Sequence, residues 1–147
     1  MRKPRLRVAV VVASFNAEIT SRLLESCGEA LAEEAPKPAV EIVRVPGSYD
    51  IPWAAQELAL SRRFDAVIAL GAIIKGETSH NDHIASALFK SLHEIALKTR
   101  VPCVMGVITP NTEAQALART RGALNRGREA AEAALALARL KRDRRWG

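Results

Sequence analysis

Runs of aliphatic residues alternate with amphipathic stretches along the chain. The aliphatic runs predict β-strands at 5–15, 39–45, 64–74 and 101–109, and the first has the continuous pattern of a strand buried on both faces of a sheet. Helical spacing of apolar residues predicts helices at 16–35, 51–63, 80–99, 112–120 and 127–142, with a break near Gly122 and Asn125 between the last two. This alternation predicts an α/β fold in which right-handed crossovers place helices on both faces of a four-stranded parallel sheet.

Length and composition favour one globular domain over residues 1–147, because 48% of the 147 residues are hydrophobic. The longest apolar run, 8–15, is far shorter than the roughly 20 residues of a membrane span, and no signal-type apolar stretch follows the basic N-terminus. Cys27 falls in a helical pattern and Cys103 in a strand pattern, as expected for unpaired thiols in a reducing compartment. We therefore expect a cytoplasmic protein without a membrane span.

The net charge of +6 is unevenly distributed. Residues 1–118 hold 13 Lys or Arg and 13 Asp or Glu, whereas residues 119–147 hold 9 basic and 3 acidic residues. Basic residues at the end of a terminal helix suit the negative end of the helix dipole. Residues 119–145 contain no aromatic side chains to stack on bases, so we do not expect nucleic-acid binding.

Polar, glycine and aromatic residues gather directly after each predicted strand. The four segments are "SFN" at 14–16, "PGSYD" at 46–50, "GAIIKGETSH" at 71–80 and "VITPN" at 107–111. In an open parallel α/β sheet, ligands bind beyond the carboxyl ends of the strands. The sequence therefore predicts a ligand site at this edge.

The stretch "GETSHNDH", 76–83, is compatible with several roles. Ser79 and Asp82 have the spacing of a weakened capping box, and a helix start also suits an anion such as phosphate. His80 and His83 share a helix face and would need Asp82 or Glu77 to hold a metal, but a further ligand cluster is missing from the sequence. His80 at the helix start is either a proton donor and acceptor or a surface histidine.

Aromatic and basic residues near the same edge also have two interpretations. Phe15 belongs to the core or stacks on a flat heterocycle. Tyr49 and Asp50 form a turn with a helix N-cap or contact a ligand. Arg119 and Arg121 complement a helix end or bind phosphate.

Four motifs, "SFN", "VPGSYDIP", "GAIIKGETSHNDH" and "GVITPNTEAQALAR", resemble in order and spacing those of the 6,7-dimethyl-8-ribityllumazine synthase family. The resemblance covers almost the whole chain. It implies a flavodoxin-like three-layer αβα subunit in a homopentamer, or in an icosahedral shell of pentamers, with active sites between neighbouring subunits. It also implies condensation of 5-amino-6-(D-ribitylamino)uracil with 3,4-dihydroxy-2-butanone 4-phosphate, without metal or organic cofactor. A non-catalytic flavin- or lumazine-binding protein of the same fold is the alternative.

The resemblance assigns roles by motif position. His80 corresponds to the catalytic histidine. The residues implied for the pyrimidine and the ribityl chain are Phe15, Ser48, Tyr49, Asp50, Ala72, Ile73, Ile74 and, from the adjacent subunit, Met105. Those implied for the phosphate are Glu77, Thr78 and, again from the adjacent subunit, Arg119.

The chain departs from the family pattern at several positions. Asp50 stands in place of the usual Glu, Lys75 in place of Arg, Asn81 in place of an aromatic residue, and Met105 where Phe is frequent. The segment 119–127 is one residue shorter than the common pattern, which leaves Arg119 and Arg121 as alternatives for the phosphate contact and Arg126 as the match to a later lysine. The last helix is apolar apart from a stripe through Glu132 and Arg139, which favours a subunit interface over simple packing on its own sheet.

Overall fold

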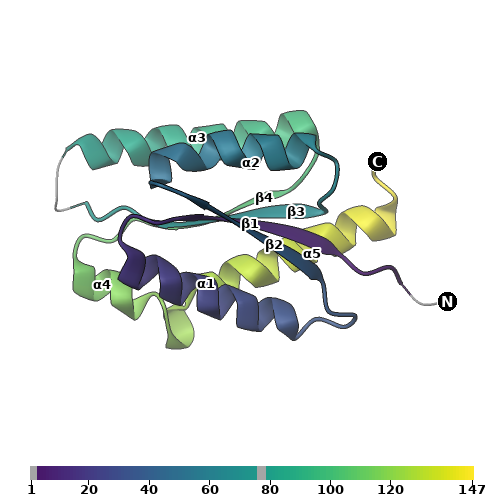
Figure 1. Ribbon diagram of the computed structural model, residues 1–147, viewed down its shortest axis with the longest axis horizontal. Helices are drawn as coiled ribbons and strands as arrows, with labels where there is room; N and C mark the ends of the chain where they lie inside the picture. Colours follow the sequence, from purple (N-terminus) through teal and green to yellow (C-terminus); the bar gives the residue numbers. More distant parts are fainter. Residues whose placement is uncertain (1–2, 76–78) are drawn as a thin grey trace.

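A parallel β-sheet forms the middle layer of the protein, with helices on both faces (Figure 1). The computed structural model describes residues 3–75 and 79–147. In chain order the elements are β1 (Arg7–Ala13), α1 (Ala17–Ala32), β2 (Ala39–Val45), α2 (Ile51–Leu60), β3 (Ala66–Ala72), α3 (His80–Thr99), β4 (Cys103–Ile108), α4 (Glu113–Ala118) and α5 (Arg126–Arg144). Short 3-10 helices at Ser48–Asp50 and Gly122–Leu124 complete the fold.

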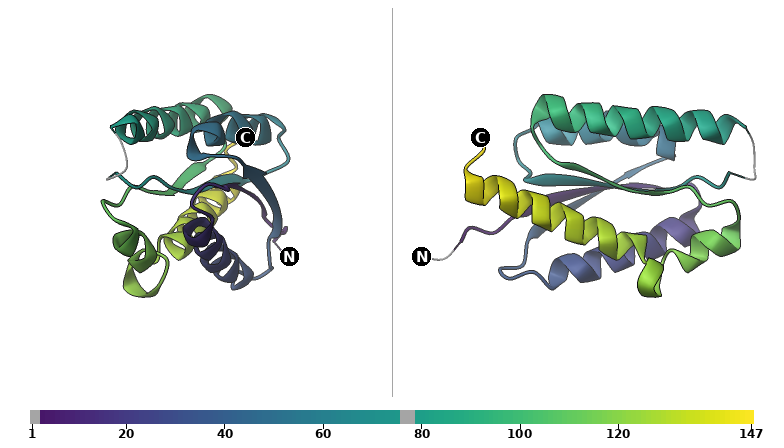
Figure 2. Two further views of the ribbon diagram at one scale, coloured as in Figure 1. Left: turned by 60° about the vertical axis from the view of Figure 1, so that its left-hand side comes forward. Right: turned by 180° about the vertical axis from the view of Figure 1, so that it is seen from behind.

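The sheet has the order β2-β1-β3-β4, and every strand pair is parallel. Helices α2 and α3 cover one face, and α1, α4 and α5 cover the other (Figures 1 and 2). The predicted three-layer, flavodoxin-like α/β fold with a four-stranded parallel sheet is therefore confirmed.

Successive residues of β1 supply the two hydrophobic cores in turn. Val8, Val10 and Val12 belong to the core beneath α1 and α5, whereas Ala9 and Val11 belong to the core beneath α2 and α3. All five are buried, as expected for the aliphatic run of a strand covered on both faces. This packing fixes which side chains reach each face and leaves the strand ends open for a site.

The last two helices are separated where the sequence predicted a break. Gly122 adopts a positive φ of 62°, which a residue without Cβ accepts easily. Asn125 then begins α5, and its side-chain oxygen accepts a hydrogen bond from the backbone N of Arg128 at 3.1 Å. Helix α5 buries one side against α1 and the sheet, while Ala133, Ala136, Leu137 and Leu140 remain exposed. Packing on its own sheet thus accounts for only part of the apolar surface of α5.

No helix formed by the described residues combines the length and the apolar character that a bilayer crossing requires.

Candidate functional site

The segments that follow β1, β2 and β3 converge at one edge of the sheet, as the sequence predicted. Backbone hydrogen bonds join the first two of them: the N of Ser14 donates to the Val45 carbonyl at 2.8 Å, and the N of Phe15 donates to the Pro46 carbonyl at 3.0 Å. These bonds hold the residues after β1 beside the turn after β2. The turn is itself closed at both ends, because the N of Gly47 donates to Asp50 Oδ2 and the N of Asp50 donates to the Gly47 carbonyl, each at 3.0 Å.

A pocket of about 140 Å³ opens between these segments and the start of α3. We call it the mouth pocket; its lining residues are Phe15, Asn16, Gly47, Ser48, Tyr49, Ala72, Ile73, Ile74, Asn81 and Ile84. Six residues that the resemblance implies for the pyrimidine and ribityl chain therefore lie together: Phe15, Ser48, Tyr49, Ala72, Ile73 and Ile74.

The two aromatic residues of the mouth pocket are largely exposed to solvent. Phe15 is 63% exposed and Tyr49 is 73% exposed. The core interpretation of Phe15 is therefore wrong. An exposed aromatic ring at the rim of a pocket presents a flat apolar face on which a planar heterocycle can stack.

Asp50 lies beside the mouth pocket without lining it. Its Oδ2 accepts the hydrogen bond from Gly47, and its backbone lies at the N-cap of α2, although the side chain makes no capping bond to that helix. The turn interpretation is confirmed, and the N-cap interpretation is confirmed by position only, because the carboxylate binds Gly47 instead of the first N–H groups of α2. Asp50 holds the turn that presents Ser48 and Tyr49.

Two asparagine side chains bind the end of β3. Nδ2 of Asn16 donates to the Ala72 carbonyl at 2.9 Å, and Nδ2 of Asn81 donates to the Ile74 carbonyl at 2.9 Å. Asn16 begins α1 in the left-handed conformation, with φ of 61°, and makes no side-chain capping bond. Asn16 therefore starts the helix at the position that the sequence predicted, 16, but its side chain binds the neighbouring strand instead of capping α1.

His80 is the first residue of α3 and is exposed. It precedes Asn81, which lines the mouth pocket, although His80 is not itself among the lining residues. Ser79 makes no side-chain capping hydrogen bond, so the predicted capping box of Ser79 and Asp82 is wrong. The predicted phosphate residues Glu77 and Thr78 lie outside the described residues.

Met105 and Arg119 line a different pocket, on the β4 side of the sheet. This edge pocket has a volume of about 310 Å³ and is lined by Met105, Gly106, Val107, Ile108, Thr109, Arg119, Arg126 and Glu129. Arg126 is paired with Glu129 at 2.6 Å, whereas within residues 3–75 and 79–147 Arg119 forms no salt bridge. Arg121 is exposed and does not line the edge pocket. One chain therefore places Phe15 and Met105 in two separate pockets.

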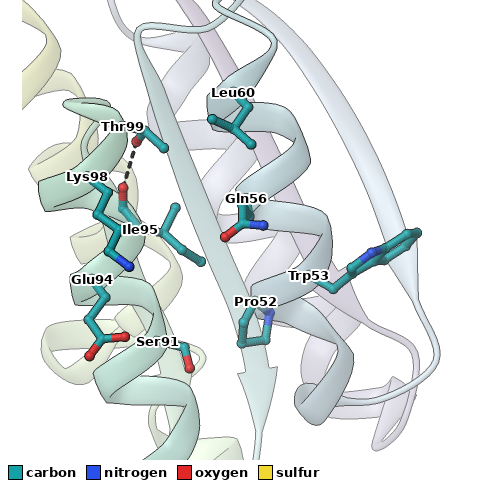
Figure 3. A pocket seen from close by; sticks show the side chains of 9 residues that line it. All are labelled: Pro52, Trp53, Gln56, Leu60, Ser91, Glu94, Ile95, Lys98 and Thr99. Carbon is teal, nitrogen blue, oxygen red and sulfur yellow. Dashed lines mark hydrogen bonds between the residues drawn. The ribbon is translucent and has the colours of Figure 1, made fainter.

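A groove of about 400 Å³ lies elsewhere, between the outer surfaces of α2 and α3 (Figure 3). Trp53, Gln56 and Leu60 line it from α2, and Ser91, Glu94 and Lys98 line it from α3. Of its lining residues, Pro52 belongs to a sequence motif, and none is a predicted site residue. In the described part of the chain, no group of three His, Cys, Asp or Glu side chains is placed to hold a metal ion.

Sequence reasoning did not name three residues of the mouth pocket: Asn16, Gly47 and Ile84. Asn16 and Gly47 fall within the segments "SFN" and "PGSYD", whereas Ile84 falls within the predicted helix 80–99. The position of Asn16 directly after Phe15 was the available signal for a role in the site. For Ile84 there was none, because an apolar residue at helical spacing is indistinguishable from a core residue in sequence.

Comparison with known proteins agrees with these motifs. A family model described as 6,7-dimethyl-8-ribityllumazine synthase matches residues 5–142. The 6,7-dimethyl-8-ribityllumazine synthase of Gloeobacter violaceus is 40% identical over 142 residues, which cover 93% of this chain and 79% of the relative. The synthase of Thermococcus gammatolerans is 42% identical over 137 residues, covering 93% of this chain and 88% of the relative. The 6,7-dimethyl-8-ribityllumazine synthase 1 of Caulobacter vibrioides is 44% identical over 131 residues, which cover 88% of this chain and 86% of the relative. The chain therefore belongs to the 6,7-dimethyl-8-ribityllumazine synthase family.

Proposed function

We propose that this chain is a transferase of riboflavin biosynthesis that makes 6,7-dimethyl-8-ribityllumazine. Its substrates are 5-amino-6-(D-ribitylamino)uracil and 3,4-dihydroxy-2-butanone 4-phosphate, and it releases phosphate and water. The observation that carries this proposal is the mouth pocket: two exposed aromatic residues, the end of β3 and the start of α3 surround it, and His80 directly precedes the lining residue Asn81. Membership of the family supports the same reaction.

The mouth pocket is the proposed site of the pyrimidine and the ribityl chain. Phe15 stacks on the ring, and the Ala72–Ile74 segment supplies the apolar wall, consistent with its burial. Ser48 and Tyr49 meet the pyrimidine and ribityl groups. Asp50 Oδ2 accepts from Gly47, and the remaining acceptor capacity of the Asp50 carboxylate is assigned to a ribityl hydroxyl.

His80 is the proposed proton donor and acceptor. The amine of one substrate attacks the ketone of the other to give an imine, phosphate leaves, and ring closure expels water. Each step moves a proton, so one imidazole serves repeatedly and contributes roughly 10²–10⁴ in rate. Holding two dilute substrates together contributes more, since effective molarities reach about 10⁵ M or above. No step of this scheme calls for a metal or an organic cofactor.

The phosphate site is assigned to Glu77, Thr78 and Arg119. The start of α3 offers unpaired N–H groups and the positive end of a helix dipole to an anion. Arg119 is favoured over Arg121 because it lines the edge pocket together with Met105. Since the edge pocket and the mouth pocket are separate within one chain, we assign Met105 and Arg119 to the site of the neighbouring copy.

This division between two copies leads to the proposed homopentamer. A ring of five chains would place the edge pocket of one copy against the mouth pocket of the next. Exposed apolar residues near β4 support such a contact: Leu97 of α3 is 68% exposed, and Leu137, Leu140 and Trp146 border the same hollow of about 510 Å³. The particle mass in solution distinguishes a single ring from an icosahedral shell of rings.

We place the protein in the cytoplasm, as the sequence led us to expect. Supporting this compartment, Cys27 and Cys103 are both free thiols.

Turnover of both substrates by the purified protein tests the proposed function. The lumazine chromophore and phosphate are expected in equal amounts, and His80→Ala is expected to lower kcat about 10²-fold or more. His83→Ala is the matched control, because His83 is also an exposed histidine on the first two turns of α3 but has no role in the proposed reaction, and its kcat is expected to change less than twofold. Tight binding of the lumazine without turnover would instead identify a non-catalytic binding protein.

A further inference from the structure

The side chain of Asn81 connects the start of α3 to the end of β3. Its Nδ2 donates to the carbonyl of Ile74 at 2.9 Å, across seven positions of the chain. Ile74 is buried and Asn81 is half-buried, so the bond is partly shielded from solvent. Asn81 is the second residue of α3 and directly follows His80.

The Ile74 carbonyl needs a partner because the neighbouring strand has ended. Strand β1 pairs with β3 only as far as Val12 and Leu70. Beyond that point the N–H groups of Ile73 and Lys75 donate toward the β4 side, to Ile108 and Pro110. Alternate residues of a strand direct their backbone groups to opposite sides, so the Ile74 carbonyl faces the side that β1 has left. A buried carbonyl without a donor is costly, and the Asn81 amide supplies the donor.

Building on the proposed function of His80, we propose that Asn81 is a positioning residue for the reaction. Its amide fixes the first turn of α3 against the wall of the mouth pocket and thereby holds the adjacent His80 backbone in place beside the substrates. The position is commonly aromatic in the family pattern, and a phenyl ring there could not donate this hydrogen bond. Placement of His80 in this chain therefore depends on a directional hydrogen bond.

Asn81→Asp tests the dependence on the donor with little change in size. An ionised Asp side chain has only acceptors and repels the Ile74 carbonyl, whereas a protonated carboxyl group donates an O–H and restores the bond. The carboxyl group is mostly ionised at pH 8 and gains protons as the pH falls toward its ordinary pKa of about 3.9. Because only the protonated form makes the bond, that pKa is raised and the restoration begins at higher pH.

The expected readout is the kcat of each variant relative to wild type between pH 8 and pH 5. At pH 8, Asn81→Asp and Asn81→Leu are both expected to lower kcat about tenfold, as the loss of one buried hydrogen bond allows. The relative kcat of Asn81→Asp then rises severalfold toward pH 5, while that of Asn81→Leu stays constant. If KM rises with kcat unchanged, or if Asn81→Asp and Asn81→Leu follow the same pH profile, Asn81 only lines the pocket and the proposal is overturned.

Thr99→Val is the matched control at the other end of α3. It removes the hydrogen bond from Thr99 Oγ1 to the Ile95 carbonyl, 2.7 Å long and drawn in Figure 3, and lies away from the mouth pocket. Its kcat is expected to stay within twofold of wild type. A tenfold loss in this variant would mean that any weakening of α3 lowers activity, which would contradict a specific role for Asn81.

Hydrogen exchange separates failure of this proposal from failure of the proposed function. Absence of turnover by the wild-type protein would remove the proposed reaction. Hydrogen exchange at the first two turns of α3 still reports on the bond between Asn81 and the Ile74 carbonyl. Asn81→Leu is expected to accelerate exchange there severalfold, whereas Thr99→Val is expected to accelerate it only near the C-terminal end of α3. Equal protection of those turns in wild type and Asn81→Leu would show that the Asn81 hydrogen bond does not hold the start of α3 in place.

Discussion

Gly71 of β3 lies so close to Ser48 that a Cβ atom at position 71 would stand 2.7 Å from the Ser48 hydroxyl oxygen. The same atom would approach Ile51 Cδ1 at 3.4 Å and Val107 Cγ2 at 3.5 Å. Only the hydroxyl contact is too short, and a hydroxyl group can rotate away. A glycine at this position thus allows Ser48 to settle against the strand end in the mouth pocket.

Gly71→Ala is therefore expected to disturb substrate binding more than folding. Displacement of Ser48 should raise the KM for the ribityl-carrying substrate severalfold, while the free energy of unfolding falls by only about 1–2 kcal/mol. Steady-state kinetics and thermal denaturation measure the two effects. Unchanged KM values would show that Ser48 does not contact the substrate.

Gly127→Ala is expected to disturb folding more than substrate binding, because it lowers the stability of the contact between α1 and α5. A Cβ atom at Gly127 would collide with the backbone carbonyl oxygen of Leu23 in α1, and a backbone atom cannot rotate away. Relief of the collision requires α1 and α5 to separate, for which overpacking costs of about 1–3 kcal/mol are typical. Thermal denaturation should show a melting temperature lower by several degrees.

Gly28→Ala is the control for both glycine variants. No atom lies within 4 Å of the position that its Cβ would occupy, and Gly28 lies inside α1. Alanine there should stabilise the helix by about 0.5–1 kcal/mol. If Gly28→Ala and Gly127→Ala shift the melting temperature equally, steric collision at Gly127 is not the cause.

Both cysteine thiols are expected to react slowly in the folded protein. Burial raises the pKa of Cys27 to about 12 and that of Cys103 to about 11, because it penalises the charged thiolate. The thiolate is the reactive form, so alkylation at pH 8 should be slow and should accelerate as the pH rises toward 11. Cys103, which is less deeply buried, should react before Cys27. Rates equal to those of the denatured chain would contradict this burial.

The ion pair between Glu33 and Arg128 should make part of the stability depend on pH. The guanidinium donates to both carboxylate oxygens, at 2.8 and 3.0 Å, and lowers the pKa of Glu33 below its ordinary value. The lowered pKa means that the pair stabilises the fold above the unfolded pKa of Glu, about 4.3, and that this contribution disappears as the pH falls through the folded pKa. Since the pair is exposed, its effect is small and is screened by salt.

Glu33→Gln checks this prediction by thermal denaturation at two pH values. At pH 7 the variant should melt slightly below wild type, because the carboxylate is lost. At pH 3 the difference should shrink, since Glu33 is then partly or fully protonated in wild type as well. A difference that is constant with pH would show that the ion pair is not its source.

The fold followed from the aliphatic runs because β1 and β3 are buried on both faces and each helix has one apolar side, although the outer strand β2 leaves Val40 and Ile42 exposed. The candidate site was predictable at the level of segments, since the carboxyl ends of parallel strands meet at one edge. The partners of the side-chain hydrogen bonds were not predictable, because an asparagine at a helix start can cap its own helix or bind another strand equally well. Asn16 and Asn81 both do the latter. The separation of Met105 from Phe15 was implied only by the family resemblance, because it depends on the position of β4 across the sheet.

Mixing two inactive variants tests whether His80 and Arg119 act from different copies. In the proposed ring, His80→Ala would damage the mouth-pocket side of each interface, and Arg119→Ala would damage the edge-pocket side. If each site combines His80 of one chain with Arg119 of the next, a ring assembled at random from equal amounts contains intact residues on both sides at about a quarter of its interfaces. Unfolding and refolding the two variants together should therefore restore about a quarter of wild-type activity, whereas refolding them separately before mixing should restore none. Arg121→Ala in place of Arg119→Ala provides the control, because Arg121 does not line the edge pocket and its variant should be active alone. Recovery that is absent after joint refolding, in assemblies verified to contain both variants, would place His80 and Arg119 in the same chain's site or remove Arg119 from it.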